Sequence, residues 1–258
     1  MRKLNIYTTL CLLLFSCTNA NIDEHTTNLI NGIPDKVIAS LDEEDTRIEL
    51  NDNLETVWSK GDAVSVFYKS DANNRYSYTG ESGEKSGELT RNTTLTGSQT
   101  IDNIVALYPY NADYSLDTQT EAISLTIPTG QRYLENSYSL GDNLMLYTGK
   151  SDNFYFRSAC GWLRLHLCGA KSVSSITLRG NNNEVLAGQA LVNTTTLNAL
   201  IVNNKAQAIT LDCAEGVTLS HSATTFHIAL APQTFEQGIT ITVQCADGST
   251  AFKSTKKR

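Results

Sequence analysis

Short runs in which apolar and polar residues alternate recur through most of this 258-residue chain, and no other feature constrains its fold as strongly. Side chains of a β-strand point alternately to the two faces of a sheet, so a period of two is typical of strands with one buried face. Val64, Val66 and Tyr68 share one face of such a run, and isoleucine or valine alternates with threonine over 239–243. No long segment has the 3.6-residue period of a helix, so the sequence predicts an all-β protein.

Runs rich in β-branched and aromatic residues, separated by Gly, Asn, Asp and Ser, are predicted as strands. They are 36–41, 47–50, 63–68, 75–79, 87–90, 103–108, 122–127, 153–157, 161–168, 173–178, 185–192, 207–212, 225–231 and 238–245. These are more strands than one β-sandwich usually holds, which favours two tandem antiparallel β-sandwich domains. The stretch 128–152 is predicted to be irregular, and the boundary near its end gives domains over 36–151 and 152–258.

Turn-forming residues lie between several of these runs. The segment 180–184 has three consecutive asparagines after a glycine, and both residue types tolerate a left-handed backbone. Asp247-Gly248 is a pair typical of tight hairpins. We therefore expect 180–184 to link two strands and 246–249 to form a hairpin tip.

The N-terminus has the features of an export signal. Arg2 and Lys3 precede a short apolar stretch that ends at Phe15. This stretch is shorter than the roughly 20 apolar residues that span a bilayer. A basic start followed by a short apolar run predicts a secretory signal peptide over 1–16.

The four residues at 14–17, Leu-Phe-Ser-Cys, resemble a bacterial lipobox, in which the cysteine receives lipid. We therefore predict that Cys17 is lipidated. Two or three acyl chains then hold the protein at a membrane, since one chain alone binds only marginally. The polar residues 17–35 are predicted to form a flexible tether. An ordinary signal peptide with an incidental cysteine is the alternative.

The charge balance narrows the class of partner. The chain carries 20 basic and 27 acidic side chains, a formal net charge of −7. A nucleic-acid partner requires a basic face. We therefore expect no nucleic-acid partner.

Four cysteines lie beyond the predicted lipidation site, at Cys160, Cys168, Cys213 and Cys245. In an exported chain they can form two disulfides, with three possible pairings. If Cys160 and Cys168 share one strand, about eight residues separate their Cα atoms by roughly 26 Å. They cannot then form a disulfide with each other, because a disulfide tolerates about 7 Å between Cα atoms. Buried free thiols are the alternative, and the sequence leaves both open.

The run VWSKGDAVSVF at 57–67 resembles the signature near the start of fimbrillin-like proteins of Bacteroidetes. Further similarities follow in the same order at 160–165, 175–188 and 226–238. Together they cover most of the chain after Lys36. The resemblance implies a lipoprotein precursor with two transthyretin-like sandwich domains, placed at the outer membrane or cell surface.

The same resemblance implies assembly into fimbriae, or pili, by strand exchange with other subunits after an arginine-specific protease removes a first strand. Arg47 is the candidate cleavage site, and an ordinary strand arginine is the alternative. An added strand satisfies the backbone groups and apolar pockets that a missing strand exposes. Relatives extend beyond the equivalent of 251–255. We therefore expect a truncated C-terminal domain that is either unstable or open at one edge to a partner.

The sequence contains no strong catalytic or metal-binding motif. His166 and Cys168 lie two residues apart on one predicted strand and are candidate ligands for one metal ion, with Cys213 or Cys245 as candidates for a third ligand. The chain has no tight C-x-x-C or H-x-x-x-H spacing, however, which is typical of metal sites. We predict no metal, no cofactor and no catalytic residue, so the chain is not expected to be an enzyme.

Two weaker features point to sugars. Asp62 and Asp142 each follow a glycine, and paired carboxylates occur in glycoside hydrolases, but both are also ordinary turn residues. Several tyrosines lie between the predicted strands, where they either stack on sugar rings or pack at strand edges. They are Tyr108, Tyr110, Tyr114, Tyr133 and Tyr138.

These observations lead to one principal hypothesis: a lipid-anchored structural, tip or anchor subunit of a fimbria that mediates adhesion. A surface lipoprotein that binds glycans or host proteins without polymerising is the first alternative. A hydrolase accessory domain is the second.

Overall fold

The computed structural model describes residues 29–30, 33–41, 49–50, 56–70, 72–96, 99–135, 137, 142–195 and 199–256. Every helix or strand element within these ranges is a β-strand, so the predicted all-β class is confirmed. The same ranges contain no helix with the length and hydropathy needed to cross a membrane.

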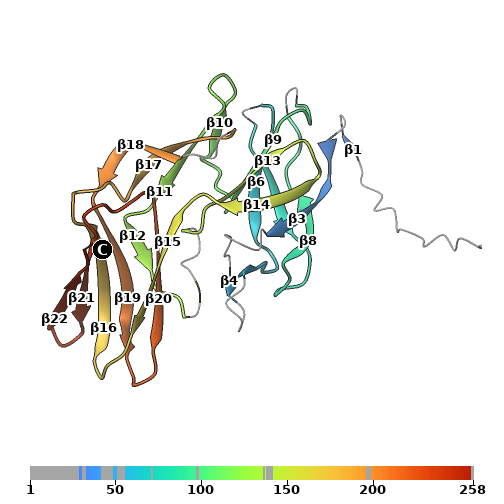
Figure 1. Cartoon of the computed structure of the whole chain (residues 1–258). Coiled ribbons are helices and arrows are strands. Elements are labelled where there is room, and N and C mark those ends of the chain that lie inside the picture. The colour runs from blue at the N-terminus through green and yellow to red at the C-terminus, as the bar shows by residue number, and fades with distance from the viewer. Residues whose placement is uncertain are drawn as a thin grey trace, which may run out of the picture.

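Seven strands form a closed barrel in the order β13-β14-β3-β8-β7-β6-β9 (Figure 1). They are β3 (Lys36–Leu41), β6 (Ala63–Tyr68), β7 (Asn74–Tyr78), β8 (Ser86–Arg91), β9 (Ile104–Tyr108), β13 (Met145–Gly149) and β14 (Asn153–Ser158). All neighbouring pairs are antiparallel except β14 with β3. Two short pairs accompany the barrel, β1 (Leu29–Ile30) with β2 (Ile33–Pro34) and β4 (Glu49–Leu50) with β5 (Thr56–Val57).

Aromatic side chains fill the barrel. Trp58 is fully buried and stacks on Tyr78 with 5.4 Å between ring centroids. The hydroxyls of Tyr68 and Tyr76 lie 2.8 Å apart, and Tyr76 also donates to the carbonyl of Pro34. These contacts satisfy two phenol groups that burial would otherwise leave without water.

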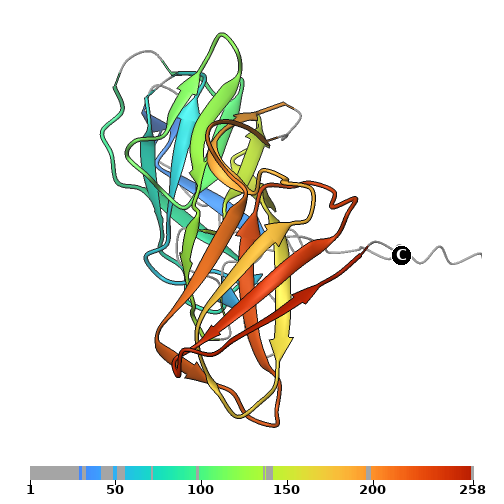
Figure 2. The ribbon, with the colours of Figure 1, turned by 90° about the vertical axis from the view of Figure 1, so that its left-hand side faces the viewer.

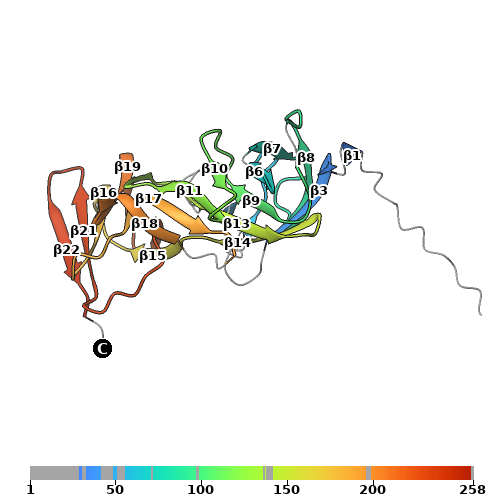
Figure 3. The same ribbon diagram turned by 90° about the horizontal axis from the view of Figure 1, so that it is seen from above.

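The remaining strands form three sheets. The first has five strands, β12 (Gly130–Arg132), β19 (Ala208–Thr218), β16 (Ser172–Gly180), β21 (Ile239–Cys245) and β22 (Thr250–Ser254), in that order. The second contains only β15 (Gly161–Leu167) and β20 (Thr224–Leu230). The third is ordered β10 (Ser115–Asp117), β11 (Ala122–Ile127), β17 (Ala187–Asn193) and β18 (Ala199–Ala206). The described part of the chain is elongated, with β22 near one end and β3 toward the other (Figure 3).

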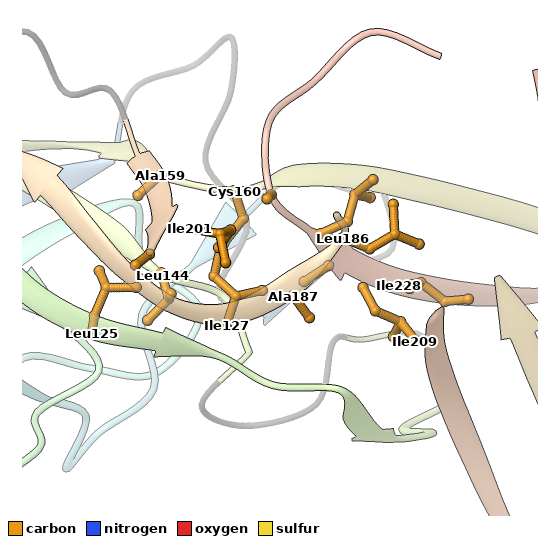
Figure 4. Packing of buried hydrophobic residues seen from close by; sticks show 14 of the residues in the cluster. Leu125, Ile127, Leu144, Ala159, Cys160, Leu186, Ala187, Ile201, Ile209 and Ile228 are labelled. Carbon is orange, nitrogen blue, oxygen red and sulfur yellow. The ribbon is translucent and has the colours of Figure 1, made fainter. Parts of the chain in front are cut away.

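One apolar cluster joins the barrel to these sheets. Phe67, Val105 and Leu107 on the outer face of the barrel belong to the same buried cluster as Leu125 of β11 and Ile228 of β20. Figure 4 shows side chains of this cluster converging from several strands. The barrel and the three sheets therefore share a core.

The strand pairing also crosses the predicted boundary. β11 pairs with β17 over six positions, from Ala122 with Asn193 to Ile127 with Gly188. The turn between β13 and β14, two neighbours in the barrel, contains the predicted boundary itself. The division into 36–151 and 152–258 stays a prediction.

Each predicted strand overlaps an observed one, and 36–41, 63–68 and 122–127 match β3, β6 and β11 at both ends. The prediction that 128–152 is irregular was wrong, because this stretch contains β12 and β13. β13 has no alternation, since Met145 faces the barrel interior while Leu146 belongs to the shared core. A strand buried on both faces carries a continuous apolar run instead of a period of two.

Candidate functional site

The two-stranded sheet lies behind the five-stranded sheet in Figure 2, and short connections fix how the two layers face each other. β15 is joined to β16 by 168–171, and β19 is joined to β20 by 219–223. The two connections also hydrogen-bond to each other, from Gly169 N to the carbonyl of Ser220. β15 therefore lies opposite β16, and β20 lies opposite β19. The edge of β15 away from β20 consequently faces the side of β21 and β22.

The other side of these layers is closed by β12. This strand pairs in parallel with β19, from Gly130 with Thr210 to Arg132 with Asp212. The Gln131 side chain reaches across to the second layer, where its Nε2 donates to the carbonyl of Ala229 at 2.6 Å and its Oε1 accepts from Ala229 N at 2.9 Å. One buried side-chain amide thus occupies the outer backbone edge of β20.

The side between β15 and β22 is open. Among the described strands, β15 pairs only with β20, and β22 pairs only with β21. The N–H and C=O groups of Ala229 bond to Gln131, so they point away from β15. Ala229 and its register partner Trp162 are therefore a non-hydrogen-bonded pair, and the backbone groups of Trp162 point away from β20. The same orientation recurs at every second residue. Arg164 and His166 therefore direct their backbone groups toward the open side.

Apolar side chains line this open side without full cover. Leu163, Leu165 and Leu167 point toward the shared core but remain half-buried, and so do Ile239 and Val243 on β21. A complete second layer would bury them.

β22 itself is uncovered on both faces. All five of its residues are exposed, and Phe252 retains 78% of its accessible surface. Ala251 pairs with Val243 and Lys253 pairs with Ile241, so these two residues share the inner face of the sheet. Their exposure means that no described residue covers that face at β22.

The third sheet has a different kind of edge. The pairing of β17 with the edge strand β18 contains register shifts between Ala187 and Gln189 and between Gln189 and Ala190. Gly188 has φ 137° and Asn204 has φ 49° beside these shifts. Such bulges twist an edge away from further pairing, whereas β21 and β22 pair over five regular positions. The open side between β15 and β22 is therefore the candidate site for an added strand.

The predicted modification sites, Cys17 and Arg47, lie outside the described residues. The four cysteines after Cys17 carry free thiols. Burial raises the pKa of Cys160 to about 12 and the pKa of Cys213 to about 11, so both remain protonated apolar groups. Cys245 is also buried and Cys168 is exposed.

The candidate metal ligands do not come together. His166 is exposed on β15, where its Nδ1 lies 3.1 Å from Thr225 Oγ1, and Cys168 follows the same strand. No group of three or more histidine, cysteine or acidic side chains within the described ranges is arranged to hold a metal ion.

The two candidate carboxylates lie in the turn before β6 and in the segment before β13. Asp62 accepts a hydrogen bond from Ser59 N at 2.8 Å in the turn before β6, as expected of a turn residue. Asp142 is buried ahead of β13.

Four of the five candidate tyrosines lie in the described part of the chain, and all four take part in packing. Tyr108 is buried in the barrel, Tyr110 lies under the Arg75 guanidinium, and Tyr133 packs on Phe226 with 5.0 Å between centroids. Tyr114 packs against the shared core, and burial raises its pKa to about 12. Tyr138 lies outside the described residues.

Comparison with protein-family models, curated proteins and solved structures finds no match to this chain. The resemblance to fimbrillin-like proteins therefore stays a prediction. Sequence reasoning missed the role of Gln131, which lies in the stretch predicted to be irregular and has no motif around it.

Proposed function

We propose that this chain is a cell-surface structural or adhesive subunit that accepts a β-strand from another subunit. The strand is added on the open side, between β15 and β22, of the C-terminal layers, which are the five-stranded sheet and the β15–β20 pair. The supporting observation is the edge of β15, whose outward backbone groups lie beside the half-buried Leu163, Leu165 and Leu167. Backbone pairing supplies affinity in this mode of recognition, and pockets for alternate side chains supply specificity.

The geometry sets the character of the incoming strand. It would run beside Arg164 and His166 and place every second side chain over the inner face of β21 and β22. Two or three buried apolar side chains contribute about 5 kcal/mol, before the cost of ordering the donor is subtracted. A segment that alternates apolar and polar residues meets these requirements.

We also propose that the N-terminal segment directs this chain to the cell surface. The chain is exported, lipidated at Cys17 and tethered at the outer membrane or cell surface. Its two units are tandem transthyretin-like sandwiches over 36–151 and 152–258, and six of the seven barrel strands come from the first unit. Cleavage at Arg47 breaks the covalent link between the lipid tether and the subunit, and the acceptor is the edge of β15, which is open before cleavage. No enzymatic activity, cofactor or metal is involved.

The test uses proline at one residue of β15. The N–H of Arg164 points toward the open side, so Arg164→Pro removes a donor for the incoming strand and leaves the bonds to β20 intact. Arg164→Ala is the matched control, because it removes the same side chain and keeps the N–H.

Purified precursor is treated with an arginine-specific protease, and oligomers that resist SDS are counted on gels. We expect ladders from the wild type and from Arg164→Ala, and monomers from Arg164→Pro. Equal ladders from both variants would contradict strand addition at β15. Monomers from all three proteins would instead favour the non-polymerising surface lipoprotein that binds glycans or host proteins.

A further inference from the structure

The strands beside the open side carry positive charge and no negative charge. They are β15 with its partner β20, and β22 with its partner β21, and none of the four contains an aspartate or a glutamate. Their basic residues at exposed positions are Arg164, His166 and Lys253. The chain as a whole has the opposite balance, with 27 acidic and 20 basic side chains. The open side is therefore a basic strip on an acidic protein.

The acidic residues closest in sequence lie in the segments that join these strands. Asp247 is at the tip between β21 and β22, and its carboxylate already lies 2.9 Å from the Lys171 ammonium. Glu236 precedes β21. Among the described residues, no ion pair involves the Arg164 guanidinium or the Lys253 ammonium. Both of these cations are thus available to a partner.

Arg164 has the position best suited to recognise an added strand. Its backbone N–H and C=O point toward the open side, so the added strand would place one residue directly opposite it. Its side chain is exposed on the outer face of β15, because Leu163 and Leu165 take the inner face. Side chains directly opposite each other have Cβ atoms about 4.5–5.5 Å apart. A carboxylate at that place in the added strand would reach the guanidinium.

The other two basic residues extend the same preference. His166 lies two residues after Arg164 on the same outer face, with its Nδ1 3.1 Å from Thr225 Oγ1. Lys253 belongs to β22, at the other border of the open side, and lies on the inner face of its sheet. Basic side chains on an added strand would be repelled from both borders, whereas carboxylates would be attracted.

We propose that the strand added to β15 comes from a partner whose donor segment is acidic on its outward face. This inference rests on the proposed function and adds the chemistry of the partner. The donor alternates apolar residues, which cover Leu163 and Leu165, with aspartate or glutamate, one of which lies opposite Arg164. Complementary charge of this kind speeds the encounter and disfavours wrong partners more than it adds affinity.

Peptide binding to the full-length protein tests the charge of the donor separately from assembly. The probes are two fluorescein-labelled peptides of the length of β15, one alternating valine with glutamate and the other valine with lysine. Fluorescence anisotropy should show several-fold tighter binding of the glutamate peptide at low salt. This preference should shrink in about 0.5 M NaCl, where exposed charges are screened. The net charge of −7 alone would favour the lysine peptide.

Two variants assign the preference to one side chain. Arg164→Glu reverses the charge at an exposed position of β15 and should abolish the preference for the glutamate peptide. Arg179→Glu is the matched control, because Arg179 is exposed on the outer face of β16, and it should keep the preference.

The outcomes separate this inference from the proposed function. Equal binding of the two peptides, tighter binding of the lysine peptide, or a preference that survives Arg164→Glu would overturn the acidic donor and leave strand addition in place. Binding of neither peptide would contradict strand addition at β15 itself, and the acidic donor would be overturned with it.

Discussion

The barrel and the C-terminal layers are built from similar strands, but the barrel has no free strand edge and the C-terminal layers have one open side. In the barrel, β9 pairs with both β6 and β13, and the ring of seven strands leaves no edge. In the C-terminal layers, Gln131 and β12 close one side, while β15 and β22 leave the other side open. Full closure removes the backbone groups that pair with other chains. The closed barrel therefore favours stability, and the open side of the C-terminal layers supports the proposed strand exchange.

The largest expected effect concerns a ring inside the barrel. Trp58 is fully buried and contacts Tyr78, Tyr108 and Phe156. Trp58→Ala should lower the free energy of unfolding by about 4 kcal/mol, because it leaves a large cavity. Phe252→Ala on the exposed β22 should change it by less than about 0.5 kcal/mol. Urea denaturation of both variants checks this contrast, and similar losses would mean that β22 is not an uncovered edge.

A smaller effect is expected where the C-terminal layers are closed. Gln131→Ala removes both partners of the Ala229 backbone, which lies in a buried position. An unsatisfied buried group costs about 2 kcal/mol, so the variant should unfold at lower urea concentration. Gln207→Ala, at an exposed position, is the control. Equal midpoints for the two variants would show that the amide does not hold the second layer.

The smallest effect concerns the tip of the β21–β22 hairpin. The Ser249 hydroxyl and the Lys171 ammonium, which lies 2.9 Å from Asp247, hold the pKa of Asp247 well below its usual range. A depressed folded-state pKa stabilises the fold above the unfolded value of about 3.9, and this contribution is lost as pH falls through the folded value.

Both side chains at this tip are exposed, so the effect on stability is small. The measurement is the carboxyl carbon shift of Asp247 followed by NMR through acidic pH. Lys171→Ala should raise the titration midpoint, and an unchanged midpoint would show that the ion pair does not form in solution.

The sequence predicts those structural features that depend on residues close together in the chain, such as single strands and tight turns. Alternation predicted β3, β6 and β11, and the Asp247-Gly248 pair predicted the turn between β21 and β22. Alternation did not reveal that β6 is covered on both faces, because Phe67 contacts a core formed largely by strands far along the chain. Local patterns carry the identity of a strand and not the sheet order around it.

The candidate site depends on such distant relations. Gln131 bonds to a residue 98 positions away, and nothing in its own neighbourhood indicates that contact. The open side follows from the order of five strands in one layer and two in the other, which single-strand patterns do not specify.

The most direct measurement of the central claim is hydrogen–deuterium exchange at the edge of β15, in the monomer and in protease-treated assemblies. We expect the amides of Arg164 and His166 to exchange quickly in the monomer and at least tenfold more slowly in the assembly, while barrel amides such as Val66 are unchanged. Unchanged exchange at Arg164 and His166 in SDS-resistant assemblies would contradict it.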